Sequence, residues 1–210
     1  MIDVYILYGP PASGKGTISK KIPPEHCIGT GALLRSKNMG LTGDLITDDY
    51  VNQLITEELK TRKGYVVFDG YPRTEGQTDY ILHLKNIRIR QVYELTCPDS
   101  ELKERLSKRQ SCICGATYHP TLKPTQKKGI CDLCGKKLFR RKDDSPEIVK
   151  KRLEQYHQMT APILAKFGIL VKKIDVSQDF KTAIQSVVKE ITAHQKKRTI
   201  LKKQLIREHE

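Results

Sequence analysis

A glycine-rich segment, Gly9-Pro-Pro-Ala-Ser-Gly-Lys-Gly-Thr17, follows directly on the apolar run Ile2–Tyr8. The run has the length and composition of a buried strand, and Gly9 and Gly14 let the backbone turn where a side chain would clash. Successive N–H groups can then face one concavity, Lys15 adds a cation, and the helix that follows contributes the positive end of its dipole. The segment therefore predicts a phosphate-binding loop between a strand and a helix, and with it a nucleotide ligand.

The residue after Lys15 departs from the strict form of this loop. It is Gly16, and the hydroxyl comes one position later, at Thr17. A serine or threonine directly after the lysine normally holds Mg²⁺. We therefore expect the metal to depend on carboxylates and water, an arrangement typical of nucleoside monophosphate kinases.

Size and charge narrow the class of protein further. A chain of 210 residues with 38% hydrophobic and 30% charged residues can build one sizeable core with room for an insertion. No apolar run reaches membrane-spanning length and the N-terminus has the pattern of a strand, so we expect a cytoplasmic protein. The net charge of +14 indicates an anionic partner, and with 4 Phe, 9 Tyr and no Trp, nucleotides are favoured over nucleic acid.

Strands and helices alternate along the chain. Further β-branched, apolar runs occur at 26–28, 65–68, 91–95 and 169–174, and helical patterns at 48–63, 78–85, 100–109, 145–165 and 180–193. This alternation predicts an α/β fold with a parallel five-stranded sheet flanked by helices, in which ligands gather at the carboxyl ends of the strands. Helical character continues from 189 to 210 on a lysine-rich surface, which favours a solvated terminal helix over a partner-binding tail.

A second motif follows the third predicted strand, in Gly64-Tyr-Val-Val-Phe-Asp69-Gly70-Tyr-Pro-Arg73-Thr74. Asp69 stands at the strand's end, where its carboxylate can hold Mg²⁺ through water. Gly70 permits close backbone approach to a ligand, and the guanidinium of Arg73 suits bidentate phosphate binding. Together with the first loop, this motif indicates a phosphotransferase.

With these motifs the chain resembles the adenylate kinases. Residues 9–17 match the family's Gly-x-Pro-Gly-x-Gly-Lys-Gly-Thr except that Ala12 replaces a glycine, and Thr30-Gly-Ala-Leu-Leu-Arg35 is similar to its Thr-Gly-Asp-Met/Leu-Leu/Phe-Arg. Asp69–Arg73 resembles the family's Asp-Gly-Phe-Pro-Arg, with Gln77 where a glutamine recognises adenine. Further matches are Arg140–Asp144, Lys151–Leu153 and Tyr156–Pro162, so the likeness runs from about residue 2 to residue 192.

The resemblance implies reversible phosphoryl transfer from MgATP to AMP, giving two ADP, by positioning and charge stabilisation. The catalytic cations it implies are Lys15, Arg73, Arg105, Arg109, Arg141 and Arg152, with Arg105 against the ATP base; Arg109 and Arg140 are the ones most open to an alternative role as surface ion-pair partners. The ATP-binding residues it implies are Gly9, Ala12, Ser13, Gly14, Lys15, Gly16, Thr17, Arg105, Arg109, Thr117, Tyr118 and Gln178. The AMP-binding residues it implies are Thr30, Arg35, Leu45, Ile46, Gly70, Arg73, Gln77, Arg141 and Arg152.

It also implies a division of the chain. We expect a core domain of residues 1–29, 64–109 and 143–195, a short AMP-binding lobe of residues 30–63, and a basic tail of residues 196–210. Residues 110–142 break the strand–helix alternation and are expected to form a lid that closes over the nucleotides and excludes water. Family habit suggests a monomer.

The lid segment holds four of the six cysteines, as Cys112-Ile-Cys114-Gly and Cys131-Asp-Leu-Cys134-Gly. Paired cysteines, each pair followed by glycine, predict a structural Zn²⁺ site of four thiolates, of the kind found in many bacterial adenylate kinase lids. The one-residue spacer between Cys112 and Cys114 leaves His119 or Asp132 as replacement ligands, and disulfides or metal-free cysteines as alternatives. The other two cysteines, Cys27 and Cys97, are expected in the core.

The AMP side departs from the family pattern. Only eight residues, 36–43, separate Arg35 from Asp44, where the family carries a longer helical flap, and Ala32 removes a carboxylate usually found near the magnesium waters. We expect weaker or less selective monophosphate binding with an unchanged reaction. Another monophosphate kinase, using UMP, CMP or GMP, is therefore the nearest alternative. A zinc-ribbon nucleic-acid-binding protein is the alternative from another class, but it leaves Asp69–Arg73 unexplained.

Overall fold

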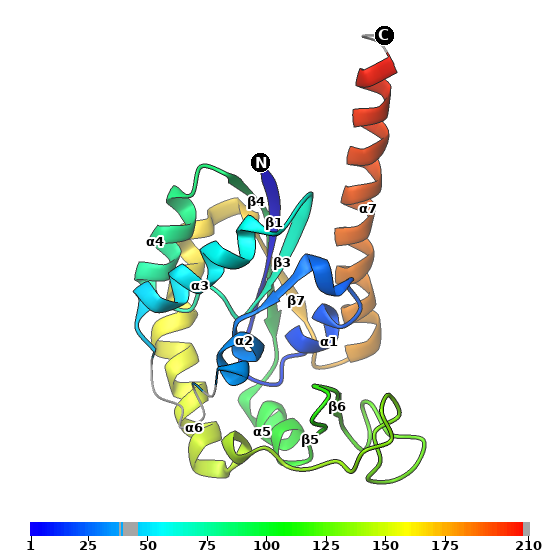
Figure 1. Cartoon of the computed structure of the whole chain (residues 1–210). Helices are drawn as coiled ribbons and strands as arrows, with labels where there is room; N and C mark the ends of the chain where they lie inside the picture. The colour runs from blue at the N-terminus through cyan, green and yellow to red at the C-terminus, as the bar shows by residue number, and fades with distance from the viewer. Residues whose placement is uncertain (38, 40–45, 208–210) are drawn as a thin grey trace.

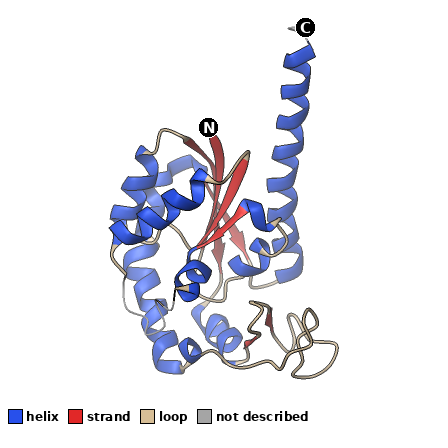
Figure 2. Ribbon diagram, in the orientation of Figure 1, coloured by secondary structure: helices blue, strands red, loops and turns tan. Residues whose placement is uncertain are grey.

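A five-stranded parallel sheet forms the centre of the computed structural model (Figures 1 and 2), which describes residues 1–37, 39 and 46–207, with side chains as far as residue 194. The strand order is β2-β3-β1-β4-β7, and each neighbouring pair is parallel. The strands are β1 (Ile2–Tyr8), β2 (Cys27–Gly29), β3 (Tyr65–Asp69), β4 (Ile87–Thr96) and β7 (Val171–Asp175). The predicted fold class is confirmed.

Helices cover both faces of the sheet (Figure 1). They are α1 (Lys15–Ser19), α2 (Thr30–Ser36), α3 (Asp48–Lys60), α4 (Glu75–His83), α5 (Asp99–Ser107), α6 (Pro146–Gln155) and α7 (Phe180–Arg207). Shorter helical segments are η1 (Pro24–His26), η2 (Lys142–Asp144), the π-helical turn η3 (Tyr156–Thr160) and η4 (Pro162–Leu170).

The central strand β1 is buried on both sides, as expected for a parallel sheet covered by helices. Val4, Ile6 and Tyr8 face a cluster completed by α3, α4 and η4. The alternate residues Tyr5 and Leu7 face a second cluster completed by α1 and α7. Each buried side chain of this size contributes about 1.5–3 kcal/mol, so the two layers hold the end of β1, and the glycine-rich loop after it, in a rigid frame.

The carboxyl ends of the parallel strands meet at one edge of the sheet, the lower edge in Figure 1. The glycine-rich loop follows β1 there, α2 follows β2, and Asp69 ends β3. Helices α5 and α6 and the short strands β5 (Gln110–Ser111) and β6 (Thr117–Tyr118) lie at the same end. This is the edge at which a ligand is expected.

The segment 145–165 is not the single helix that its periodicity predicts. Helix α6 ends at Gln155, and a π-helical turn and the 3₁₀ segment η4 follow. Pro162 stands at the start of η4, where its missing N–H is tolerated, and Gly168 within η4 has a non-helical conformation with φ of 51°. The expectation of one continuous helix was therefore wrong.

Two other elements have bounds that differ from the predicted ones. Helix α4 begins at Glu75, earlier than the predicted 78–85, because the hydroxyl of Thr74 caps it by accepting from Gln77 N at 3.2 Å. Strand β4 is longer than the predicted 91–95 because it pairs along nearly the whole of β1.

Residues 110–142 are mostly loop (Figure 2) around the antiparallel pair β5–β6 and isolated bridges such as Ser111–Phe139. The small buried cluster of this segment consists of Cys112, Ala116, Tyr118 and Cys131, with Leu138 packed against it. So little apolar area cannot hold a fold by itself, and a further cross-link is expected.

The last helix, α7, runs to Arg207 and extends beyond the body of the molecule (Figure 1), which confirms the predicted helical character of this region. Among the described residues, no helix combines the length and apolar composition needed to cross a bilayer.

Candidate active site

The glycine-rich loop adopts the backbone that its glycines predict. Gly9 and Gly14 have φ of 142° and 104°, a region that residues with side chains rarely occupy. A Cβ at Gly9 would lie 2.7 Å from Leu95 O, and one at Gly14 would lie 2.8 Å from side-chain atoms of Ile184 and Phe180. Ser13 is buried within the loop, and Gly16 and Thr17 lie in the first turn of α1. Neither glycine can be replaced without moving the loop.

Ala12 occupies the position where the family pattern has glycine. Its φ is 64°, in the left-handed region that disfavours a Cβ by roughly 1–2 kcal/mol. Its methyl group packs against a cluster of α5 and α6 side chains, Leu102, Leu106, Val149 and Leu153. Packing therefore offsets part of the backbone strain, and the loop keeps the shape that a glycine would have allowed.

The ammonium of Lys15 lies over the loop. Its Nζ donates to the carbonyl oxygens of Gly9 at 2.6 Å and Pro10 at 2.7 Å. Burial lowers the pKa of Lys15 to about 7, with Asp69 opposing this and the cations Arg73, Arg152 and Arg109 adding to it. An anion bound at the loop would favour the charged form of Lys15 over the neutral form.

Asp69 faces the loop from the end of β3. Its Oδ2 accepts from Ser19 Oγ at 3.1 Å and lies 3.6 Å from where a Cβ on Gly16 would stand. A carboxylate with a hydroxyl beside it, next to a phosphate loop, fits a hydrated Mg²⁺ ion. Ser19 carries no motif signal, and the sequence analysis did not identify it.

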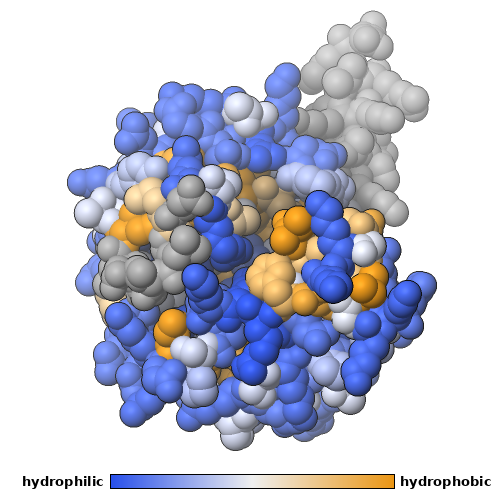
Figure 3. Space-filling model, turned by 60° about the horizontal axis from the view of Figure 1, so that its bottom comes forward, coloured by the Kyte–Doolittle hydropathy of each residue, from blue (hydrophilic) through white to orange (hydrophobic). Residues whose placement is uncertain are grey.

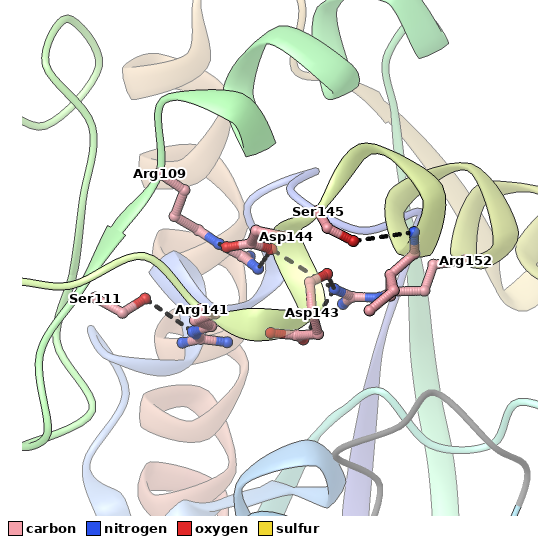
Figure 4. A network of polar contacts seen from close by, with 8 residues as sticks. Arg109, Ser111, Arg141, Asp143, Asp144, Ser145 and Arg152 are labelled. Carbon is pink, nitrogen blue, oxygen red and sulfur yellow. Dashed lines mark hydrogen bonds and ion pairs between the residues drawn. The ribbon is translucent and has the colours of Figure 1, made fainter.

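Three of the predicted arginines converge on the turn before α6 (Figure 4). Arg109 Nε donates to Asp144 Oδ2 at 2.9 Å, and its Nη2 donates to Asp144 Oδ1. Arg152 Nη1 donates to Asp143 Oδ2 at 3.0 Å and lies 3.8 Å from Asp144 Oδ1. The Asp144 side chain is 0% exposed, and both of its oxygens bind Arg109, so the direction of the Arg109 guanidinium is fixed.

Arg141 reaches the same region from residues 110–142. Its Nε donates to Ser111 Oγ at 2.8 Å (Figure 4). Burial lowers the pKa of Arg141 to about 10, helped by the neighbouring charges of Arg109 and Arg35. Arg35 on α2 therefore lies close enough to Arg141 for their charges to interact. Arg140, in contrast, is exposed. The space-filling view of this end shows strongly hydrophilic side chains across its centre (Figure 3).

Arg73 and Gly70 form a tight turn after β3. Arg73 Nε donates to Gly70 O at 2.8 Å, and Gly70 has φ of 81°. A Cβ on Gly70 would lie 2.6 Å from Arg73 Nη2. Burial lowers the pKa of Arg73, with Asp69 opposing and Arg35 adding to the effect. The positive φ of Gly70 favours glycine whatever the space around it, while the predicted close approach of a ligand to its backbone stays a prediction.

The expected AMP-binding residues lie around this turn. Thr30 is buried, and its hydroxyl donates to Gly70 O at 3.1 Å. Ile46 packs against the cluster between the sheet and α3. Leu45 and most of the short segment 36–43 lie outside the described residues. The expectation of a shortened AMP-binding lobe therefore stays a prediction.

Gln77 is buried, and both ends of its amide are bound. Oε1 accepts from Arg73 N at 2.8 Å, and Nε2 donates to Asp48 Oδ1 at 2.8 Å. No motif in the sequence marks Asp48 as a partner of Gln77, and the two residues meet because α3 packs beside α4.

Arg105 is 5% exposed. Its Nη2 donates to Val176 O at 2.6 Å and pairs with Glu101, while its Cζ lies 4.9 Å from the centre of the Phe180 ring. Its Nε and Nη1 are buried and have no partner within the part of the chain that the structure describes. The exposed Gln178 lies in the loop between Val176 and Phe180. Phe180 was not identified from the sequence, although it supplies the surface on which Arg105 stacks.

Thr117 and Tyr118 form strand β6, within residues 110–142. Lys20, just after α1, donates from Nζ to Gly115 O at 2.6 Å and lies 3.4 Å from Thr117 Oγ1. Tyr118 points into the small buried cluster, where its hydroxyl lies 3.3 Å from Cys131 Sγ. Any contact of Tyr118 with a nucleotide would therefore come from its backbone.

The four cysteines of residues 110–142 gather at one point. Their sulfur atoms all lie within 4.8 Å of one another, with Cys112–Cys134 at 3.4 Å and Cys114–Cys131 at 3.6 Å. These distances exceed an S–S bond of about 2.05 Å and suit four thiolates around one Zn²⁺ ion. The one-residue spacer is thus compatible with the site.

Among the described residues, the group of atoms close enough to hold one metal ion contains the four cysteines and neither of the two replacement ligands. His119 Nδ1 accepts from Thr121 N and Leu122 N at 3.2 Å, and Asp132 Oδ1 accepts from Gln126 N at 3.0 Å. Cys27 and Cys97 are partly buried and pack against the core cluster on the α1 and α7 side, as expected for core residues.

Comparison with known proteins agrees with this geometry. A profile of the family described as "Adenylate kinase" matches residues 7–170. The chain is 40% identical to the adenylate kinase of Methanosarcina barkeri, over 91% of this chain and 98% of that protein. It is 36% identical to the adenylate kinase of Lachnospira eligens, over 88% and 97% of the two chains. With a phosphate loop, a converging set of arginines and a cysteine cluster in the places described, the chain belongs to the adenylate kinase family.

Proposed function

We propose that this protein, as a phosphotransferase of the adenylate kinase family, transfers the γ-phosphoryl group of ATP to AMP at the edge of the sheet where Lys15 lies. The observation that carries the proposal is the charge around Lys15: Arg73, Arg109 and Arg152 all lie near enough to lower its pKa. They come from three separate segments of the chain. Cations brought together in this way repel one another, and two facing polyphosphates would reverse that repulsion.

In this mechanism the side chains position charge and form no covalent intermediate. Lys15 exchanges the carbonyl oxygens of Gly9 and Pro10 for phosphate oxygens. Arg109 and Arg152, already held by Asp144 and Asp143, face the group being transferred without reorganising. Asp69 would hold Mg²⁺ through water, and when bound the ion neutralises charge on the phosphates.

The acceptor nucleotide would lie between α2 and the turn at Gly70. Its phosphate would meet Arg35, Arg73 and Arg141, and its base would meet Gln77. Thr30, Leu45, Ile46 and Arg152 complete this set as proposed. Ala32 has no carboxylate, so at this position the protein cannot bind the water molecules around Mg²⁺, and Asp69 would do so without its help. This difference supports the expectation that the monophosphate binds more weakly.

The donor base would lie beside Arg105, whose Nε and Nη1 have no partner among the described residues and whose guanidinium stacks on Phe180; both features support a binding role there. We further propose residues 110–142 as a lid closed by a structural Zn²⁺ ion, 30–63 as the short AMP-binding lobe and 196–210 as a basic tail. The remaining residues would form the core. A cytoplasmic monomer is the proposed state.

The test is a product assay. Purified protein is incubated with MgATP and, separately, with AMP, CMP, UMP or GMP, and the diphosphates formed are measured. We expect ADP from AMP, and loss of product in Lys15→Met, which removes the cation of the phosphate loop. Faster conversion of another monophosphate than of AMP would replace the proposal with that kinase activity. Polynucleotide binding that is equal in wild type and Lys15→Met, together with no diphosphate formed by the wild-type protein, would favour the nucleic-acid alternative.

A further inference from the structure

We propose that Asp48 determines which base the acceptor site prefers, because its carboxylate fixes the orientation of the Gln77 side-chain amide. The inference rests on the proposed function in one respect, namely that Gln77 faces the acceptor base. It assigns Asp48 a positioning role in specificity, since it acts through Gln77 and not on the substrate.

The two partners of Gln77 permit one orientation of its amide. The backbone N–H of Arg73 can only donate, and it meets Oε1 at 2.8 Å. The Asp48 carboxylate can only accept, and it meets Nε2 at 2.8 Å. Turning the amide over would set NH₂ against N–H on one side and a carbonyl oxygen against a carboxylate on the other. In a residue that is 5% exposed, water cannot relieve either conflict.

Asp48 is itself held in place. Its second oxygen, Oδ2, accepts from Thr74 Oγ1 at 2.7 Å, and Thr74 in turn caps α4 by accepting from Gln77 N. The space for the carboxylate exists because residue 76 is glycine, where a Cβ would lie 2.7 Å from Asp48 Oδ2. The first residue of α3 is thus bound to the first turn of α4, and the amide between them cannot reorient alone.

The fixed amide has one N–H and one oxygen lone pair left for a ligand. Adenine and cytosine offer an acceptor ring nitrogen beside an amino group, which matches this polarity. Guanine and uracil offer a ring N–H beside a carbonyl oxygen, which is the reverse, and they would require the amide to turn over. The orientation therefore favours AMP over GMP, and CMP over UMP, independently of the size of the base.

Asp48→Asn tests this directly, with Asp49→Asn as the matched control because Asp49 is the adjacent, exposed residue. An asparagine at 48 can still accept from Thr74, and its NH₂ can donate to a reversed Gln77. Of the two groups that oppose reversal, only the Arg73 N–H then remains. We expect the kcat/KM ratios of GMP to AMP and of UMP to CMP to rise about tenfold in Asp48→Asn, the equivalent of one hydrogen bond. In Asp49→Asn both ratios should stay at the wild-type value. Gly76→Ala, which displaces the carboxylate sterically, should shift the two ratios in the same direction.

The inference is overturned if folded Asp48→Asn and Gly76→Ala keep the wild-type ratios, or if all four monophosphates lose activity by the same factor. The latter is the result of a merely structural role. Thermal unfolding of each variant establishes that it is folded. A wild-type protein that phosphorylates none of the four nucleotides would instead contradict the proposed function, so the two failures are distinguishable.

Discussion

Arg109 and Asp144 form a two-point ion pair across the site, with Arg109 Nε 2.9 Å from Asp144 Oδ2 and Nη2 bound to Oδ1 (Figure 4). The pair joins the end of α5 to the turn before α6. The sequence left open whether Arg109 is a surface ion-pair partner or faces the substrates. The structure shows that it is paired, but with a carboxylate that is 0% exposed and lies beside Arg152. Asp144 therefore orients cations of the site and offsets their mutual repulsion before a nucleotide binds.

The first prediction concerns this carboxylate. Asp144→Asn should lower kcat/KM for both substrates by roughly tenfold or more, because Arg109 loses the carboxylate that positions it and Arg152 loses a neighbouring negative charge. It should also lower the free energy of unfolding by roughly 2–3 kcal/mol, since a cation that remains largely buried loses its partner. Steady-state kinetics and urea denaturation measure the two effects. The exposed Glu147→Gln, three residues away, is the control and should leave both unchanged; equal behaviour of the two variants would contradict the assignment.

The second prediction is a pH dependence of ATP binding that arises from Lys15. Burial has lowered its pKa to about 7 from the ordinary 10.5, so in the free protein the amine is largely neutral above pH 7. Bound phosphates favour the ammonium form and raise that pKa, so binding above about pH 7 takes up a proton. Affinity for a non-hydrolysable ATP analogue should therefore fall as pH rises from about 7.5 to about 9, by at most tenfold per unit.

Titration calorimetry in buffers of different ionisation enthalpy measures both the affinity and the proton uptake. In Lys15→Met the analogue should bind more weakly at every pH, and the part of the pH dependence due to this amine should disappear. An unchanged slope in the variant would show that another group is responsible.

A third prediction concerns the contact between Lys20 and residues 110–142, the proposed lid. The Lys20 ammonium donates to Gly115 O at 2.6 Å, and so binds residues 110–142 to the end of α1. Lys20→Met should destabilise that arrangement by about 1 kcal/mol and raise KM for ATP about fivefold, with a smaller effect on kcat. The neighbouring Lys21→Met removes the same charge without this contact. Identical KM values for the two variants would mean that the contact has no part in nucleotide binding.

The fourth prediction concerns the cysteine cluster. Elemental analysis should find one zinc ion per chain, and Cys131→Ser should lose it, because Cys131 is a buried member of the cluster. The variant should unfold roughly 5 °C lower, the shift that a loss of about 2 kcal/mol produces in a domain of this size. Cys97→Ser, outside the cluster, and His119→Ala should both retain the metal. Zinc-free wild-type protein, or loss of zinc in His119→Ala, would contradict the four-cysteine site.

Features that depend on local backbone chemistry could be predicted from the sequence. The glycines at positions 9, 14 and 70 mark places where φ is positive, a conformation that residues with a Cβ rarely adopt. Lys15 directly follows Gly14, so its place in the loop is also fixed by the sequence. The alternation of apolar runs with helical periods predicted the parallel sheet and the edge where the site lies. The two cysteine pairs also predicted the cluster that they form, because a single short loop between the pairs is enough to bring the four sulfur atoms together.

Other features could not be predicted, because they join segments that are distant in the sequence. Asp48 binds Gln77 across 29 residues, and Arg109 binds Asp144 across 35, and neither pair has a spacing that marks it. The helical period through 145–165 gave no sign that the backbone would change to a π-helical turn and then a 3₁₀ segment. Periodicity reports which residues face the core and does not distinguish between helix types that bury nearly the same face.

The residue types and their order by themselves determined the fold, the phosphate loop and the supply of cations, since these depend on steric limits and hydrophobic periods that act over a few residues. Only the tertiary structure decided which carboxylate holds each cation and which way the Gln77 amide faces. Those outcomes depend on helix packing that brings donors and acceptors within about 3 Å of each other, and a linear sequence carries no such distance.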